Sequence, residues 1–214
     1  MLGAQQSWTE PVMESLPVTA DPGELEELSL AVWDERDQHG RVVWSVSDYH
    51  LLVDVELRHM VAVLRDNDGN LGRLPNLLEY EWRLVSQRGP QRVIEERQET
   101  GFRFLGISAT YDTSLRSVSV DRSGREPAAF ELRFDMLESH DGKLRDTRGW
   151  YYLEERMVDG RPLTYFRQWT LLEIDRTFPL LPVILRRFTA GTSATVIEAL
   201  ADAARERAAA GAAQ

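Results

Sequence analysis

The strongest constraint on the fold is a stretch of almost 100 residues, from Tyr80 to Ile174, that carries strand signals and no long helix. Apolar and charged side chains alternate most clearly in Phe130, Glu131, Leu132, Arg133, Phe134, Asp135 and Met136. This alternation is typical of an antiparallel strand with one buried face. Residues that favour turns divide the stretch at Arg88-Gly89-Pro90, Thr100-Gly101, Asp112-Thr113, Ser123-Gly124, His140-Asp141-Gly142 and Asp159-Gly160. The pattern predicts about six antiparallel strands and argues against a parallel sheet with helical crossovers.

Helical and irregular segments flank this stretch. Residues 1–23 contain three prolines and no periodicity, and we expect an extended or disordered N-terminal arm. Residues 24–38 predict a short helix and a strand, His39-Gly40 a hairpin turn, and residues 42–53 a strand. Asp54 is the predicted N-cap of an amphipathic helix over residues 55–66. A second short helix, limited by Pro75, is expected over residues 71–78.

A second helical region is predicted near the C-terminus, over residues 178–210. Gly191, with the threonines and serine around it, suggests a kink or two separate helices. We expect residues 208–214, which are rich in Ala and Gly, to form a disordered tail. Residues 24–207 are then expected to form a single domain.

The order of these elements and several short patterns resemble one known superfamily. Leu74-Pro75-Asn76-Leu77-Leu78 resembles a short helix that carries a proline, and Arg148-Gly149-Trp150-Tyr151-Tyr152-Leu153 resembles a Gly-Trp strand whose spacing is one residue shorter. Residues 54–66, 164–167 and 178–182 fit the neighbouring elements. Together they resemble the START/Bet v 1-like superfamily (SRPBCC), which includes lipid-transport proteins and polyketide cyclases. The resemblance implies an α+β helix-grip fold, in which a curved antiparallel sheet wraps around a long C-terminal helix and two short helices follow the first strand.

Charge and composition restrict the partners. The chain has 35 acidic and 25 basic residues, a formal net charge of −10. This balance argues against nucleic acid as a partner, because phosphate binding requires positive charge. It argues equally against an anionic membrane surface, and no apolar run reaches the length of a stable membrane insertion. No intact signal peptide is recognised, so the compartment stays open between cytoplasm and, after removal of a leader, periplasm. The oligomeric state is open as well.

The usual catalytic motifs do not occur. The chain has no cysteine, and its four histidines show no metal-ligand spacing, so we expect neither a metal site nor a cofactor. A nucleophile elbow is missing, and the presence of a single lysine, Lys143, argues against imine chemistry. Adjacent carboxylates such as Glu95 and Glu96 point to opposite faces of a strand and cannot act as a pair. His50 and His59 are interpreted as hydrogen-bonded or surface side chains, and no catalytic residue is assigned.

Aromatic residues on the predicted strands are the most informative set. If their shared face lines the cavity, they provide an apolar lining, and Arg148 or Arg167 becomes a buried cation that needs an anionic partner, either Glu154 or an acidic ligand. The candidate ligand-binding residues are Trp82, Phe104, Phe134, Arg148, Trp150, Tyr152, Tyr165, Arg167, Trp169 and Phe188. Alternation alone leaves the opposite orientation, towards the convex face, equally open.

The expected function is therefore binding or transport of a hydrophobic or amphipathic small molecule, lipid-like or polycyclic, in an internal cavity. Two alternatives remain open. One is an enzyme of the cyclase, aromatase or hydrolase type that uses the same cavity. The other is an interaction module with a filled core.

Overall fold

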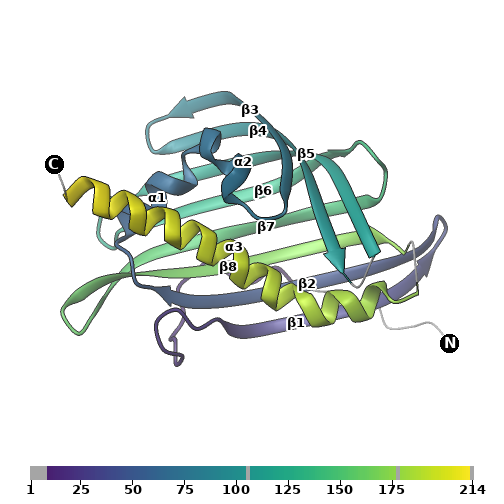
Figure 1. The fold of residues 1–214 in the computed structure, drawn as a ribbon, viewed down its shortest axis with the longest axis horizontal. Coiled ribbons are helices and arrows are strands. Elements are labelled where there is room, and N and C mark those ends of the chain that lie inside the picture. Colours follow the sequence, from purple (N-terminus) through teal and green to yellow (C-terminus); the bar gives the residue numbers. More distant parts are fainter. Residues whose placement is uncertain (1–8, 105–106, 177–178, 213–214) are drawn as a thin grey trace.

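The chain folds into one curved antiparallel sheet and a long helix (Figure 1). A computed structural model describes residues 9–104, 107–176 and 179–212, except for the side chains of residues 102–104, 107, 188 and 212. In these residues the sheet has eight strands in the order β1-β2-β8-β7-β6-β5-β4-β3. The strands are β1 (Glu26–Asp37), β2 (Gly40–Val53), β3 (Leu77–Arg88), β4 (Gln91–Phe104), β5 (Ile107–Arg122), β6 (Ala129–Ser139), β7 (Leu144–Val158) and β8 (Arg161–Asp175). The helical elements are α1 (Leu57–Leu64), η1 (Asn67–Gly69), α2 (Asn70–Arg73) and α3 (Leu181–Ala212).

Helix α3 crosses one face of the sheet, which is called the concave face here (Figure 1). On the same face, α1 packs beside α3 against β7 and β8, and α2 lies near β3. The main core lies where these elements meet, with Leu153 of β7 and Phe166 of β8 packed against Ile197 and Leu200 of α3. The predicted architecture, a curved sheet around a long C-terminal helix with two short helices, is confirmed.

The predicted N-terminal half differs in detail. Residues 24–38 contain no helix; β1 occupies almost all of them and pairs with β2 as an edge strand. The predicted N-cap at Asp54 is wrong, because α1 begins at Leu57 and Glu56 takes the N-cap position without a side-chain hydrogen bond. The second short helix ends at Arg73, before Pro75 rather than after it. Pro75 has no backbone N–H to continue the helix, and strand β3 begins two residues later.

Two predicted turns lie inside long strands. Thr100-Gly101 belongs to β4 and Asp112-Thr113 to β5. Gly101 serves a close approach instead of a turn: a Cβ atom there would lie 2.8 Å from the Leu78 side chain. Its N–H also donates to the carbonyl of Asn76 at 2.8 Å. The predicted turns at 88–90, 123–124, 140–142 and 159–160 do join strands.

The C-terminal helical region is one helix. α3 runs unbroken through Gly191, and the Thr195 hydroxyl donates to the Gly191 carbonyl within it. The helix continues to Ala212, into the segment for which the sequence predicts a tail. Alanine has the highest intrinsic helix propensity, so residues 208–212 can extend a helix that is already formed.

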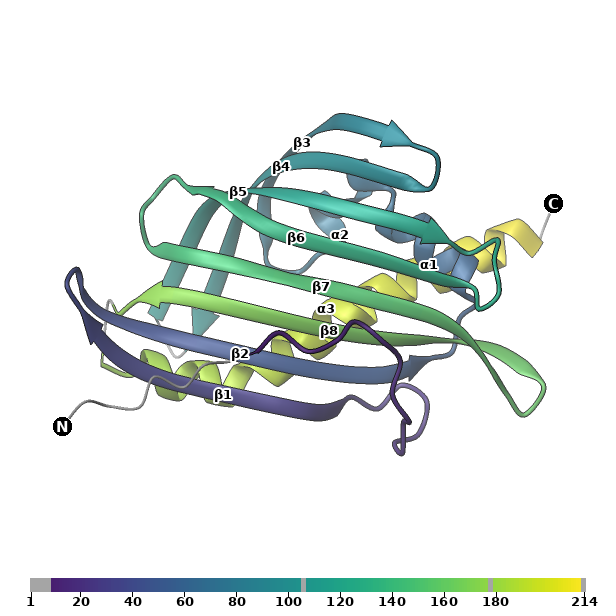
Figure 2. The same ribbon diagram turned by 180° about the vertical axis from the view of Figure 1, so that it is seen from behind.

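The N-terminal arm lies on the opposite, convex face of the sheet, over part of β2, β7 and β8. Residues 9–23 contain no helix or strand and run across the backs of the central strands (Figure 2). The side chains of Met13 and Val18 pack against an apolar cluster of β2, β7 and β8. The arm therefore shields a part of that face that would otherwise be open to water.

Candidate functional site

A pocket lies between α3 and the concave face, towards the N-terminal end of α3. Its volume is about 350 Å³. Thr147, Thr170 and Leu172 contribute from β7 and β8, and Ile184 and Thr192 contribute from α3. None of its described lining residues is charged. A neutral, mostly apolar wall with scattered hydroxyl groups suits an apolar molecule that carries few polar atoms.

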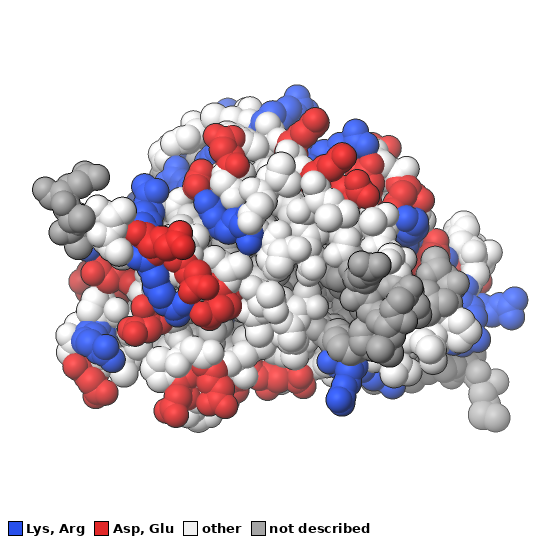
Figure 3. Space-filling view, in the orientation of Figure 1, with Lys and Arg blue, Asp and Glu red and all other residues white. Residues whose placement is uncertain are grey.

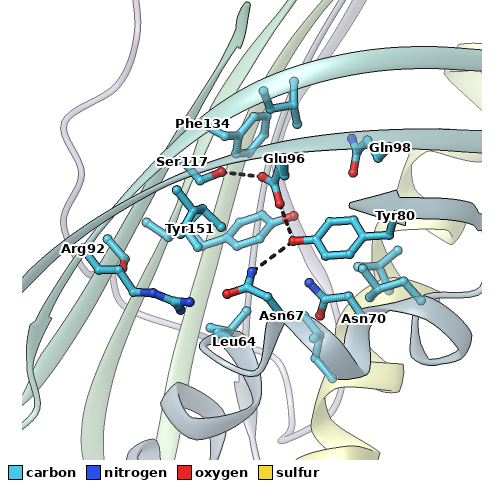
Figure 4. A pocket seen from close by; sticks show the side chains of 17 residues that line it. Leu64, Asn67, Asn70, Tyr80, Arg92, Glu96, Gln98, Ser117, Phe134 and Tyr151 are labelled. Carbon is cyan, nitrogen blue, oxygen red and sulfur yellow. Dashed lines mark hydrogen bonds between the residues drawn. The ribbon is translucent and has the colours of Figure 1, made fainter. Parts of the chain in front are cut away.

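A smaller pocket adjoins it, between the helical elements α1, η1, α2 and α3 and the strands β3 to β7 (Figure 4). Its volume is about 170 Å³. Gln98, Phe134 and Tyr151 line both pockets, so the two spaces meet at these three side chains. Burial raises the pKa of Tyr151 to about 12, so its hydroxyl stays neutral and available as a hydrogen-bond donor.

A carboxylate occupies the wall of the smaller pocket. Glu96 accepts a hydrogen bond from the Tyr80 hydroxyl at 2.6 Å and a second from the Ser117 hydroxyl at 2.5 Å (Figure 4). Burial and the neighbouring Glu96 carboxylate raise the pKa of Tyr80 above its ordinary value. Tyr80 therefore keeps its proton and donates a hydrogen bond to Glu96.

This arrangement fixes the orientation of Asn67. The Asn67 amide nitrogen lies 3.0 Å from the Tyr80 oxygen and donates to it, because the single Tyr80 proton is already directed at Glu96. Asn67 is only 5% exposed, and its carbonyl oxygen has no hydrogen-bond partner among the described residues. A buried acceptor without a partner costs about 1–3 kcal/mol, which a donor on a ligand or a water molecule would recover.

A cation completes the polar pocket. Arg92 donates to the backbone carbonyl of Arg65 at 3.0 Å, and its guanidinium lies 5.0 Å from the centre of the Trp82 ring. It forms no ion pair with the carboxylates of the described residues. Burial and the positive charge of Arg65 lower the pKa of Arg92. The smaller pocket thus joins Glu96, amide groups and Arg92, whereas the larger pocket is uncharged.

Sequence comparisons identify no relative: no protein-family model matches the chain, and no curated protein matches it. Solved structures do match. A STAR-related lipid transfer protein from Xanthomonas axonopodis aligns with a TM-score of 0.54 at 14% identity, over 81% of this chain and 98% of its own. Human StAR-related lipid transfer protein 5 aligns with a TM-score of 0.56 at 12% identity, over 82% and 86%. Human STARD10 gives 0.56 at 10% identity, over 85% and 75%.

The chain shares the helix-grip fold of these three structures. Identities this low establish the fold alone. Among the described residues of this helix-grip domain, no helix is both long and apolar enough to cross a bilayer. In the same part of the chain, no three His, Cys, Asp or Glu side chains gather in a way that suits a metal ion.

Among the ten candidate ligand-binding residues, Phe134 is the one whose described side chain lines the two pockets. Trp82 lies beside the smaller pocket, where its indole N–H donates to Asp68 at 2.8 Å and its ring packs on Arg92. The side chains of Phe104 and Phe188 lie outside the described part of the structure.

The other six candidates lie on the convex face, away from both pockets. They are Arg148, Trp150 and Tyr152 of β7 and Tyr165, Arg167 and Trp169 of β8. Their alternation is as expected, with each group of three on one face, but that face packs under the arm and not around the cavity. Arg148 is exposed, and the aromatic members form a buried cluster in which the Trp150 and Trp169 rings stack at 6.4 Å.

Arg167 is nevertheless the buried cation that the pattern suggests. The residue is 4% exposed, and its guanidinium pairs with Asp48 of β2 through contacts of 3.0 and 2.8 Å. Burial lowers the pKa of Arg167, but the hydrogen bonds and charge of Asp48 outweigh burial and leave that pKa raised. The anionic partner is therefore Asp48, whereas the sequence suggested Glu154 or a ligand. Glu154 instead accepts from the Tyr152 hydroxyl at 2.7 Å.

The residues that do face the pockets carry weak sequence signals. Tyr151 is the neighbour of two candidates, one position out of phase with them. Glu96 is one of two adjacent carboxylates, and the expectation that such neighbours face opposite ways is met: Glu95 pairs with Arg83 and Arg116 at the surface. The sequence offers one signal for Glu96. It lies two residues after Ile94 and four after Arg92, so the three side chains share one face of the strand, and all three line the same pocket.

Proposed function

We propose that this protein binds a hydrophobic or amphipathic small molecule between α3 and the concave face of its sheet. The observation that carries the proposal is the contact between an uncharged pocket of about 350 Å³ and a polar pocket of about 170 Å³. Small-molecule pockets commonly span about 300–1,000 Å³ and combine apolar walls with a few polar groups. Volumes of this size weigh against an interaction module with a filled core.

The polar pocket indicates what kind of end the ligand has. Asn67 offers an unpartnered acceptor, and each Glu96 oxygen has spare lone-pair capacity beyond its one hydrogen bond. A hydroxyl or amine on the ligand can donate to both. An end that carries only acceptors would leave the Asn67 oxygen without a partner. We therefore expect the polar end of the ligand to carry hydrogen-bond donors, with its apolar body beside Phe134, Tyr151 and Thr170.

The surrounding surface is compatible with the entry and exit of an apolar ligand. On the face that carries α3, charged side chains gather around the margins and a broad uncharged region lies across the middle (Figure 3). Two of the matching structures are named as lipid transfer proteins, and their shared fold supports a carrier function for this chain. The identity of its ligand does not follow from theirs.

A titration with N-phenyl-1-naphthylamine, an uncharged dye that fluoresces in apolar sites, tests the proposal with two matched variants. Thr192 lines the larger pocket, and Thr195 lies one turn later on the exposed side of the same helix. Thr192→Trp fills the pocket, and we expect it to weaken dye binding at least about tenfold, or about 1.4 kcal/mol. Thr195→Trp should bind like the parent protein. Equal binding by both variants would contradict the site.

An enzyme remains a second candidate because Glu96 faces the pocket with hydrogen bonds from Tyr80 and Ser117, an arrangement suited to proton transfer. Mass spectrometry of small molecules extracted from natively purified protein separates the two functions. A carrier releases its ligand unchanged on repeated loading. An enzyme converts the added compound, and Glu96→Gln stops the conversion without abolishing binding.

A further inference from the structure

Among the contacts that hold the N-terminal arm on the sheet, two lead to one buried histidine, besides those made by Arg167 and Arg156. At the first point, the Leu16 N–H donates to the Tyr165 hydroxyl oxygen at 3.1 Å. At the second, Glu26 accepts from the Thr19 N–H at 3.1 Å and from its hydroxyl at 3.0 Å. His50 lies between Tyr165 and Glu26. Its Nδ1 is 3.2 Å from the Tyr165 oxygen, and its Nε2 is 3.2 Å from a Glu26 oxygen.

The neighbours of His50 define its neutral form. A bare Nε2 would set a lone pair against the Glu26 carboxylate, so the proton lies on Nε2 and Nδ1 is the acceptor. Tyr165 then donates its only proton to Nδ1 and accepts from Leu16. The donor and the acceptor of each hydrogen bond between Leu16 and His50 are thus fixed. The His50 Nε2 contact with Glu26 is electrostatic, since the N–H is not aligned for a hydrogen bond.

Charged groups lie near His50 on its own strand and on both neighbouring strands. Glu26 approaches from β1, Asp48 shares β2, and Arg167 lies directly opposite His50 on β8. The arm contributes Glu14, whose side chain is exposed and whose carbonyl accepts from Arg167 at 3.0 Å. The His50 side chain itself is fully buried.

We infer that the arm is a pH-sensitive strap, docked on the convex face while His50 is neutral and released when His50 is protonated. Protonation places a hydrogen on Nδ1, where the Tyr165 proton already points. Tyr165 must then turn its proton towards the buried interior, where it has no partner among the described groups, or give up its contact with Leu16. Lifting of the arm removes the conflict, because water then reaches both Tyr165 and the imidazolium.

The electrostatic balance agrees with this direction. Burial lowers the pKa of His50 below its ordinary value of 6.5, and the attraction of Glu26 offsets only part of the effect. The state with the arm lifted therefore binds a proton more readily than the docked state. By linkage, the ratio of lifted to docked protein rises up to tenfold per pH unit as the pH falls below the His50 pKa of the lifted state.

Hydrogen exchange of the full chain tests the strap. The protection factor of the Leu16 amide, corrected for intrinsic exchange, is measured from pH 7.5 to pH 5. We expect it to fall several-fold at the acid end, while the Leu153 amide in the centre of β7 stays protected. His50→Gln cannot titrate but can still accept from Tyr165, and its Leu16 protection should not change with pH. His59→Gln, on helix α1, should respond like the parent protein.

Constant Leu16 protection in the parent protein across this range overturns the inference, as does a pH response that His50→Gln retains. Should His50→Gln fail to fold, an NMR titration of the His50 ring in the parent chain decides. A pKa below 6.5 that coincides with the loss of Leu16 protection supports the strap. A pKa at or above that value overturns it. Tyr165→Phe removes the first anchor, so it should weaken Leu16 protection at pH 7.5 as well.

Discussion

Removal of Asp48 from the buried pair with Arg167 should be among the most damaging single changes in the molecule. Both side chains are almost fully buried, and two hydrogen bonds of 3.0 and 2.8 Å join them. Asp48→Ala leaves the guanidinium with only the backbone carbonyls of Val12 and Glu14 as acceptors. Hydrogen bonds to charged groups contribute about 1.5–3 kcal/mol each, and removal of one partner from a buried pair costs about 3–5 kcal/mol. We expect a loss of about 3–5 kcal/mol.

Urea unfolding followed by tryptophan fluorescence measures this loss, because Trp150 and Trp169 are buried beside the pair. A double-mutant cycle with Arg167→Met separates the pairing from the burial of an unpaired charge. The double variant should be clearly more stable than the sum of the single losses predicts, since no charge is left buried. Asp112→Ala, at an exposed pair with Arg97, is the control and should change stability little. A loss below about 1 kcal/mol for Asp48→Ala, or an additive cycle, would refute the reasoning.

Three further predictions concern other parts of the fold. Gly149→Ala should lower the free energy of unfolding by about 1–3 kcal/mol or more in urea, because its Cβ would lie 2.4 Å from the Trp169 carbonyl oxygen; a neutral change would contradict that crowding. Tyr80→Phe should lower the melting temperature, since it removes two hydrogen bonds, one to Glu96 and one from Asn67, each worth about 1 kcal/mol; an unchanged melting temperature would oppose this. Stability should fall as the pH drops below about 6.5 because the unfolded chain protonates His50 more readily than the folded chain, and His50→Gln should flatten that slope.

The fold could be predicted because local signals and topology agree. Alternation along the strands and turns at 88–90, 123–124, 140–142 and 159–160 are local properties, and they leave few arrangements for so many consecutive antiparallel strands. The errors arose where a tertiary contact replaced a local one. Gly101 resembles a turn residue, but it makes room for Leu78 of the adjacent strand.

The candidate site could not be predicted to the same extent. A period of two shows that Trp150 and Tyr152 share a face, but it does not show whether that face is concave or convex. The decision depends on the arm, a segment with no periodic signal that nevertheless buries Met13 and Val18 against the sheet. Large aromatic residues are as suitable for packing under an arm as for lining a cavity, so composition alone could not separate these roles.

The most direct test of the account is to find where an apolar ligand contacts the chain. A long-chain alcohol that carries a photoactivatable diazirine is bound to the protein and irradiated, and the labelled residues are identified by tandem mass spectrometry. The account predicts labels on the concave face and α3, at residues such as Tyr151, Thr170 and Thr192. Labels confined to the convex cluster around Trp169 and to Met13 of the arm would contradict it.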